Sequence, residues 1–332
     1  MLQLLRRSLS YVKEVAKTAK RQGVKTTEYA SVNLWKLFFE HYITFNETIM
    51  KMKSKGSFTL VPFGGLANRM YAMASAYCTC RANGSRLGVV WFREWGMKAD
   101  FGDIFEPWAD DSNATVREGN LWDKVVNERP RKRNLYIPKL MQRIAYDRRI
   151  YEDSVSRLRD GGLDFAEWSR GRRCYMVTCI EFAKIPTEVW GQLFRPVKPV
   201  MDAVEANCNL FSAYTIGMHI RRSDNLESIR QSPTHLFVEA GKREFALHPN
   251  LKIFLATDSE QVKQEMRDVF GDRIITASAP ASRESIGGIR DGLVDMFSLA
   301  RTRQIYGSWF SSFSEMASKI GGCKLTVLTA KR

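Results

Sequence analysis

The sequence predicts an α/β protein with a parallel, doubly wound sheet in its C-terminal part. From residue 212 onward, short apolar runs rich in β-branched and aromatic residues alternate with runs of helical period. Such strict alternation is typical of parallel sheets, in which a helix follows each strand. The chain has 332 residues, of which 44% are hydrophobic. Because this exceeds one ordinary core, we expect two domains.

Residues 1–55 are expected to form a basic helical extension. They contain 11 Lys and Arg residues against 4 Glu. They lack the apolar core and the cleavage site of a signal peptide, and no run of about 18 apolar residues occurs in the sequence, so we expect no transmembrane helix. The aromatic segment 32–45 follows a basic one, a pattern compatible with peripheral contact to an anionic membrane face.

The alternating elements begin after this extension. We expect strands at 57–63 and 86–92 and, between them, a helix that ends at Gly84. The Gly64–Gly65 turn opens this helix, whose free N-terminal amides favour an anion, although a tight turn alone also explains two glycines. Residues 93–185 show weak periodicity, and we expect insertions or a variable substrate-binding region there.

The C-terminal part follows a segment with two prolines, 195–208, which we expect to be the interdomain hinge. Local signals mark several helices: Ser232 caps one, Gly271 ends another, and Ser312 forms a capping box with Glu315. The expected strands are 214–220, 252–258, 273–278, 304–309 and 324–329, and the expected helices are 232–249, 259–271, 288–302 and 311–322.

Polar side chains stand where three of these strands end. Ligands of doubly wound sheets bind beyond the carboxyl ends of the strands, so we expect these side chains to converge on one crevice. They are His219, Arg221, Arg222, Asp258, Ser311, Ser312 and Phe313.

These residue types favour a phosphorylated ligand, although each has a plainer interpretation. The guanidinium of Arg221 can make two parallel hydrogen bonds to a phosphate, or it can pair with Asp224 or Asp258. Asp258 can accept two N–H groups from a guanine edge, or it can cap the helix that follows. His219 can contact the base, or it can pack as an ordinary strand histidine.

The sequence contains no Asp-x-Asp pair, which many nucleotide-sugar transferases use to hold a divalent ion on the diphosphate. The positive charge would then come from Arg221, Arg222 and Arg69, and we expect neither a metal nor a cofactor. The six cysteines fit no zinc framework, so we expect reduced thiols in a cytoplasmic protein.

The net charge of +15 indicates an anionic partner, such as a nucleic acid, a membrane or a phosphorylated ligand. Basic clusters lie at 129–133, 146–150 and 169–173. No zinc-finger, RNP-like or helix-turn-helix pattern accompanies them, so nucleic acid is the less favoured partner.

Four segments carry a resemblance to a known family. In chain order they are GGLANRM at 64–70, HIRRSD at 219–224, IFLATDS at 253–259 and SWFSSFSEMA at 308–317. Together they resemble the metal-independent fucosyltransferase superfamily, which includes α-1,6- and α-1,2-fucosyltransferases and the nodulation-factor enzymes. Ala67 stands where relatives usually have Gly.

The resemblance covers roughly residues 57–92 and 212–325, and it implies the GT-B fold of two facing Rossmann-like domains. Residues 56–195 would form the N-terminal domain on the acceptor side. Residues 196–332 would form the C-terminal domain, which binds the nucleotide sugar. The helical extension would precede both.

The resemblance also implies roles for individual residues. Arg221 is similar to the arginine that holds the β-phosphate and stabilises the departing diphosphate, and Arg222 would support the same loop. His219 and Asp258 resemble the residues that recognise guanine. The others would line the phosphates, namely Ser311, Ser312 and Phe313, or form the first-domain loop that closes on the diphosphate and fucose, namely Gly64, Gly65, Asn68 and Arg69.

The implied reaction is an inverting transfer of fucose from GDP-fucose to a glycan hydroxyl, with Asp224 or Glu227 as the base. A cytoplasmic enzyme, peripheral at the inner membrane face and acting on a surface polysaccharide or a lipid-linked glycan, is expected. Two alternatives stay open: a GT-B transferase for another nucleotide sugar, and a non-catalytic basic protein on this fold that binds nucleic acid or membrane.

Overall fold

The computed structural model describes residues 56–330, with gaps at residue 95 and at 109–112, 223–225 and 278–283. Compactness divides the chain into two units, Met1–Gly56 and Ser57–Arg332. The basic extension at 1–55 and its expected membrane contact lie outside the described residues. Among the residues that are described, no helix is both long and apolar enough to cross a bilayer.

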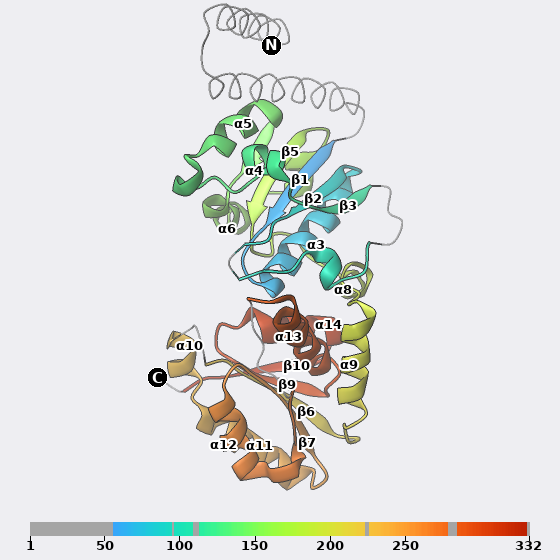
Figure 1. Ribbon diagram of the computed structural model, residues 1–332, viewed down its shortest axis with the longest axis vertical. Coiled ribbons are helices and arrows are strands. Elements are labelled where there is room, and N and C mark those ends of the chain that lie inside the picture. The colour runs from blue at the N-terminus through green and yellow to red at the C-terminus, as the bar shows by residue number, and fades with distance from the viewer. Residues whose placement is uncertain (1–55, 95, 109–112, 223–225, 278–283, 331–332) are drawn as a thin grey trace, which may run out of the picture. The chain divides into compact units, whose positions relative to one another are not determined.

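The first half of the larger unit contains a five-stranded parallel sheet (Figure 1). The two strands expected from the sequence, at 57–63 and 86–92, are confirmed. The other three strands lie within 93–185, where the sequence shows no clear period. In the order of the sheet the strands are β3 (Ala114–Glu118), β2 (Arg86–Trp91), β1 (Ser57–Pro62), β5 (Arg173–Thr178) and β4 (Arg148–Ile150).

Helices cover both faces of this sheet, because alternate residues of each strand point to opposite sides. Phe58 and Leu60 of β1 belong to the core that includes α3, whereas Val61 packs in a second core with Val126 of α4 and Ala145 of α5. The helices of this half are α3 (Leu66–Asn83), α4 (Leu121–Val126), α5 (Ile137–Ala145), α6 (Glu152–Asp160), α7 (Phe165–Ser169) and α8 (Thr187–Leu193), with short 3-10 turns at Phe101–Asp103 and Lys132–Asn134.

A second five-stranded parallel sheet forms in the C-terminal half, as the alternating pattern predicts. Four of its strands match the expected ones closely, but the strand expected at 273–278 is only two residues long. In the order of the sheet the strands are β10 (Lys324–Leu328), β9 (Gln304–Ser308), β6 (Thr215–Ile220), β7 (Lys252–Thr257) and β8 (Ile274–Ile275).

This sheet is also covered on both faces, with α11 and α12 on one side and α13 on the other (Figure 1). Met218 of β6 packs with Phe237 of α11 and Met266 of α12, whereas Phe254 of β7 lies in the core that includes Leu293 of α13. The helices of this half are α9 (Lys198–Cys208), α10 (Leu226–Gln231), α11 (Thr234–Leu247), α12 (Glu260–Phe270), α13 (Ile286–Leu299) and α14 (Ser312–Gly321), with a 3-10 turn at Gly271–Arg273.

Two expected helix caps are wrong. Helix α11 begins at Thr234 after Pro233, and the Ser232 hydroxyl instead accepts a hydrogen bond from the Trp309 amide at 2.8 Å. Helix α14 begins at Ser312 itself, so Ser312 and Glu315 form no capping box. The Ser232 hydroxyl is thus in contact with the end of β9, and Ser311, the actual N-cap of α14, has its hydroxyl 3.2 Å from His219 Nδ1. The expected stop at Gly271 is confirmed, with φ of 62°.

The segment expected to be the hinge begins with a short extended stretch. The Glu106 amide donates to the Arg195 carbonyl at 2.8 Å, and the Val197 amide donates to the Ile104 carbonyl at 3.1 Å. Helix α9 then packs with the second half, where Asn207 donates to the Ser298 hydroxyl at 3.1 Å. A domain boundary near residue 195 stays a prediction.

Candidate functional site

Strands β9, β6 and β7 are neighbours in the second sheet, and the structure brings their carboxyl ends together as expected. The Ser308 hydroxyl at the end of β9 donates to the His219 carbonyl at 3.2 Å and accepts from the Arg221 amide at 3.1 Å. The Arg222 amide donates to Asp258 Oδ1 at 2.7 Å. These contacts join the three strand ends into one polar edge.

His219 is buried at this edge. Its ring stacks on Phe313 with centroids 4.7 Å apart, and its Nδ1 lies 3.2 Å from the Ser311 hydroxyl. Burial lowers the pKa of His219 to about 4, nearby Arg221 lowers it further, and Asp258 opposes the shift. His219 is therefore neutral at pH 7, with one ring nitrogen as a donor and the other as an acceptor.

The side chain of Arg222 contacts residues of the second half. Its Nη1 donates to the Arg221 carbonyl at 2.7 Å, and its Nη2 donates to the Ser232 carbonyl at 3.0 Å and to Thr234 Oγ1 at 2.9 Å. Burial lowers the pKa of Arg222 below its ordinary value. The guanidinium thus connects the end of β6 to the start of α11, and both Arg221 and Arg222 are half-buried at the edge.

Asp258 does not cap the helix that follows it. Ser259 is the N-cap of α12, and its hydroxyl accepts from the Val262 amide at 3.3 Å. Asp258 instead connects β7 to the loop after β6 through the Arg222 amide. Its carboxylate is half-buried at the same edge as His219.

The two expected base residues fare differently. Asp224 lies outside the described residues. Glu227 lies in the first turn of α10, a short helix that the sequence pattern did not predict. Its Oε1 accepts from Arg230 at 2.7 Å and from Gln231 at 2.8 Å. Its role as a base stays a prediction.

The segment after β9 is fixed on both sides. The Trp309 amide donates to the Ser232 hydroxyl, and the Trp309 carbonyl accepts from the Ser228 hydroxyl, each at 2.8 Å. Phe310 follows with φ of 52°, a left-handed conformation that costs a non-glycine residue free energy, and it stacks obliquely on Trp309 with centroids 5.2 Å apart. Such strain is common at functional sites. Sequence reasoning missed Ser228, because its role depends on a contact 81 residues away.

Helix α14 approaches β9 closely enough to bring Ser311 and Phe313 to His219. The approach requires glycine at position 307, since a Cβ there would lie 2.6 Å from the Ser314 hydroxyl. The Ser311 hydroxyl contacts His219 and caps no helix amide, while Ser312 is the first residue of the helix.

The other expected group lies at the carboxyl end of β1 in the first sheet. Gly64 has φ of 80°, which favours glycine, and Gly65 precedes α3 without a side-chain cap. Asn68 is half-buried in the first turn of that helix. Among the described contacts, none joins this group to the polar edge of the second sheet.

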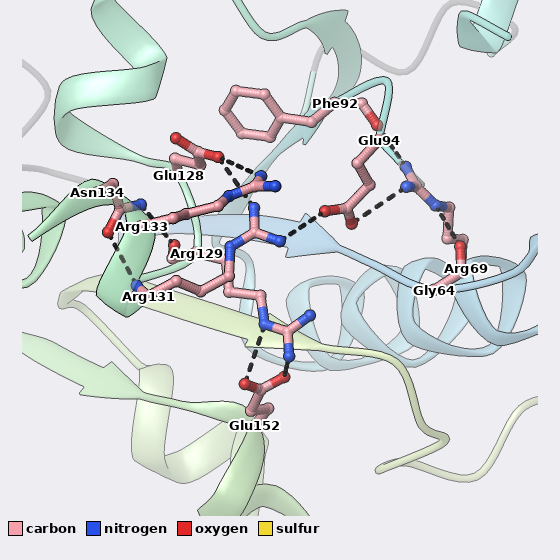
Figure 2. Close-up of polar contacts among 10 residues, drawn as sticks. All are labelled: Gly64, Arg69, Phe92, Glu94, Glu128, Arg129, Arg131, Arg133, Asn134 and Glu152. Atoms are coloured by element: carbon pink, nitrogen blue, oxygen red, sulfur yellow. Dashed lines mark hydrogen bonds and ion pairs between the residues drawn. The ribbon is translucent and has the colours of Figure 1, made fainter. Parts of the chain in front are cut away.

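Arg69 is fully buried, and its contacts are internal (Figure 2). Its Nε donates to the Gly64 carbonyl and its Nη1 to the Phe92 carbonyl, each at 2.9 Å, while its Nη2 lies 3.4 Å from Glu94 Oε1. Burial lowers its pKa to about 10, and Glu94 opposes the shift. Contact with a ligand would need another conformation of the loop, so in this structure Arg69 positions the Gly64 turn.

The Glu94 carboxylate extends this network to the segment after α4. Its Oε2 accepts from Arg131 Nη1 at 3.2 Å, and Arg131 Nη2 donates to Glu128 at 2.9 Å. Arg129 pairs with Glu152, at 2.7 Å between Nη2 and Oε2 (Figure 2). Part of the basic cluster at 129–133 is thus committed to ion pairs inside the first half.

One carboxylate escaped the sequence reasoning. Asp295 of α13 is buried, and its Oδ1 has no hydrogen-bond partner among the described residues. Burial raises its pKa to about 7, Asp291 raises it further, and Lys263 opposes the shift. The available signal was an acid with an apolar residue on each side, Val294 and Met296.

Among the described residues, no three His, Cys, Asp or Glu side chains converge on a possible metal position. Metal independence stays a prediction.

Comparison with known proteins shows the fold. No family model matches the chain, and no curated protein matches it. The structure of NodZ α-1,6-fucosyltransferase soaked with GDP-fucose superposes with a TM-score of 0.58 at 18% identity, over 80% of this chain and 93% of that one. A second NodZ structure, from Bradyrhizobium, gives a TM-score of 0.56 at 19% identity, over 80% and 93%. Arabidopsis thaliana FUT1 in complex with GDP gives 0.56 at 14%, over 96% of this chain and 78% of that one. The expected GT-B fold is confirmed.

Proposed function

We propose that the protein is a glycosyltransferase that transfers fucose from GDP-fucose to a glycan hydroxyl, with inversion and without a metal. The observation that carries the proposal is the polar edge of the second sheet. There a neutral, ring-stacked His219 lies beside Arg221 and Asp258, where a doubly wound sheet binds its ligand. Fold neighbours solved with GDP or GDP-fucose support the same reading.

Some of these residues would contact the donor, and others would position the residues that do. His219 and Asp258 would hydrogen-bond the guanine edge, with Phe313 fixing the imidazole plane. Arg221 would hold the β-phosphate, with Ser311 and Ser312 at the start of α14 beside it. Hydrogen bonds hold two of these positions, since the Ser308 hydroxyl accepts from the Arg221 amide and Arg222 Nη2 donates to the Ser232 carbonyl.

The reaction then needs little further machinery. As the bond from the anomeric carbon to the diphosphate lengthens, negative charge grows on the diphosphate and positive charge on the sugar ring. A fixed guanidinium at Arg221 stabilises the departing diphosphate, an effect of several kcal/mol in comparable sites. The acceptor hydroxyl attacks from the opposite face, and Asp224 or Glu227 takes its proton.

The leading alternative is a transferase that uses a different nucleotide-sugar donor. Asp258 Oδ1 already accepts from the Arg222 amide, so the carboxylate has less capacity for both N–H groups of a guanine. A GT-B transferase for a sugar on another nucleotide therefore stays open. A non-catalytic basic protein on this fold would bind no nucleotide at this edge.

A thermal-shift panel of GDP, GDP-fucose, GDP-mannose, UDP and ADP separates these readings. Each ligand is tested with and without EDTA. A shift with the guanine nucleotides that EDTA leaves unchanged supports the proposal. A shift with UDP or ADP instead favours the second donor, and a shift that needs added metal contradicts metal independence.

The acceptor we propose is a surface polysaccharide or a lipid-linked glycan, reached from the cytoplasm at the inner membrane face. The basic residues of 1–55 motivate this location. Recovery in the membrane fraction with and without residues 1–55 tests it, and equal recovery would remove the proposed contact.

A further inference from the structure

A second feature of the first half has no place in the proposed transfer. The segment 132–143, here called the basic–apolar surface, turns four large apolar side chains toward solvent. Their exposed fractions are 78% for Leu135, 51% for Tyr136, 49% for Ile137 and 61% for Leu140. Four exposed cations lie among them: Lys132, Arg133, Lys139 and Arg143.

Hydrogen bonds between the Asn134 side chain and the backbone hold this surface in place. The Asn134 side chain accepts from the Arg131 amide and donates to the Arg129 carbonyl, each at 2.9 Å (Figure 2). Arg129 and Arg131 are in turn tied to acids of the first half. The exposed side chains therefore project from a braced loop and from the first turns of α5.

Two of the apolar residues stand in strained positions. Leu135 has φ of 51° and Tyr136 has φ of 54°, a region that favours Gly, Asn or Asp. Burial of these two side chains does not offset the free energy of the strain, because both are exposed. A binding role for the side chains accounts for their presence better than the fold does.

The charge of the segment is one-sided. Residues 129–143 contain six Lys and Arg and no Asp or Glu. Arg133 shares Glu128 with Arg131. Among the described residues, no ion pair involves Lys132, Lys139 or Arg143. At least three positive charges thus border the exposed apolar side chains.

We propose that the basic–apolar surface docks on an anionic lipid bilayer. Leucine and isoleucine side chains would enter the boundary between headgroups and acyl chains, and the tyrosine would lie at the headgroup level. The cations would contact lipid phosphates, whose charge complements theirs. Single-stranded nucleic acid would favour aromatic stacking over exposed leucines. The proposal does not depend on the identity of the sugar donor.

Flotation of the full chain with vesicles tests this surface. One variant removes charge, with Lys132→Gln, Lys139→Gln and Arg143→Gln. Because each basic residue near an anionic surface contributes about fivefold in affinity, the variant should bind phosphatidylcholine–phosphatidylglycerol vesicles about 100-fold more weakly. The wild-type chain should bind these vesicles, lose affinity as salt rises, and ignore pure phosphatidylcholine.

A second variant removes apolar surface while keeping the charge. Leu135→Asn and Tyr136→Asn suit the left-handed backbone, and Leu140→Gln suits the helix, so the fold should persist. Its affinity for the same vesicles should fall at least about tenfold.

The matched control removes three exposed cations from α11 and α12, through Lys242→Gln, Arg243→Gln and Arg267→Gln. It lowers the net charge equally and should bind vesicles like the wild-type chain within a few-fold. Equal binding by both surface variants and the wild type would overturn the proposal, as would equal losses in the control. A lipid-free change from dimer to monomer in the apolar variant would also overturn it, since the surface would then join two copies of this chain.

Discussion

Replacing Arg69 with methionine should destabilise the protein strongly, because the guanidinium is a buried brace of the Gly64 turn. It donates to the Gly64 and Phe92 carbonyls at 2.9 Å each and has no exposed surface. Charge-assisted hydrogen bonds contribute about 1.5–3 kcal/mol each, and the two carbonyls would be left without these donors. Methionine keeps apolar contact with Trp91, over which the guanidinium now lies 4.5 Å from the ring centroid. We expect a loss of about 3–5 kcal/mol in the free energy of unfolding.

Equilibrium unfolding in urea, followed by tryptophan fluorescence, measures this loss. Arg93→Met is the matched control, since Arg93 pairs with Asp100 and Asp103 at the surface and should leave stability unchanged. A loss below about 1 kcal/mol for Arg69→Met, the size of a surface ion pair, would refute the bracing role. Unchanged stability with abolished GDP binding would show instead that Arg69 contacts the ligand.

Two further predictions concern buried titratable groups. The pKa of His219 is lowered from 6.5 to about 4, so its contribution to stability should be present above pH 6.5 and lost as pH falls toward 4, by up to about 3 kcal/mol. The free energy of unfolding of His219→Gln, measured in urea, should therefore depend less on pH between 6.5 and 4 than that of the wild type. Parallel pH profiles of the two proteins would contradict this prediction. The pKa of Asp295 is raised from 3.8 to about 7, so its contribution to stability is present below pH 3.8 and lost as pH rises through 7. The free energy of unfolding of Asp295→Asn should therefore rise relative to that of the wild type across this range, by up to about 4 kcal/mol. A difference between the two proteins that stays constant with pH would contradict this prediction.

The second sheet was predictable because β6 and β7, which are neighbours in it, are almost wholly buried. β6 and β7 are continuous buried runs separated by amphipathic helices, and parallel connection then requires their carboxyl ends to meet. The adjacency of His219 and Asp258 follows from that rule alone. Their chemical surroundings do not, since the ring stacking on Phe313 depends on how closely α14 packs.

The first sheet was less predictable for the same physical reason. β3 is a half-exposed edge strand and β4 has three residues, so neither produces a readable period. β5 is almost wholly buried, but a short apolar run does not distinguish a strand from a buried helix.

Polar side chains with distant partners were the other failure. Ser232 looked like a helix cap, yet its hydroxyl accepts from the Trp309 amide, 77 positions away in the chain. The role of Arg69 at the phosphates stays a prediction, and in this structure its guanidinium donates to the Gly64 carbonyl. A local sequence pattern gives the hydrogen-bonding capacity of such groups and not the partner that the tertiary fold supplies.

Calorimetric titration of GDP into the wild-type chain and into Arg221→Ala tests the central claim most directly. If the polar edge of the second sheet binds the diphosphate, the wild type binds GDP and Arg221→Ala binds at least about tenfold more weakly, with unchanged melting temperature. Arg243→Ala, an exposed arginine of α11, should bind like the wild type. Equal affinity of Arg221→Ala and the wild type, or no binding of GDP by the wild type, would contradict the account.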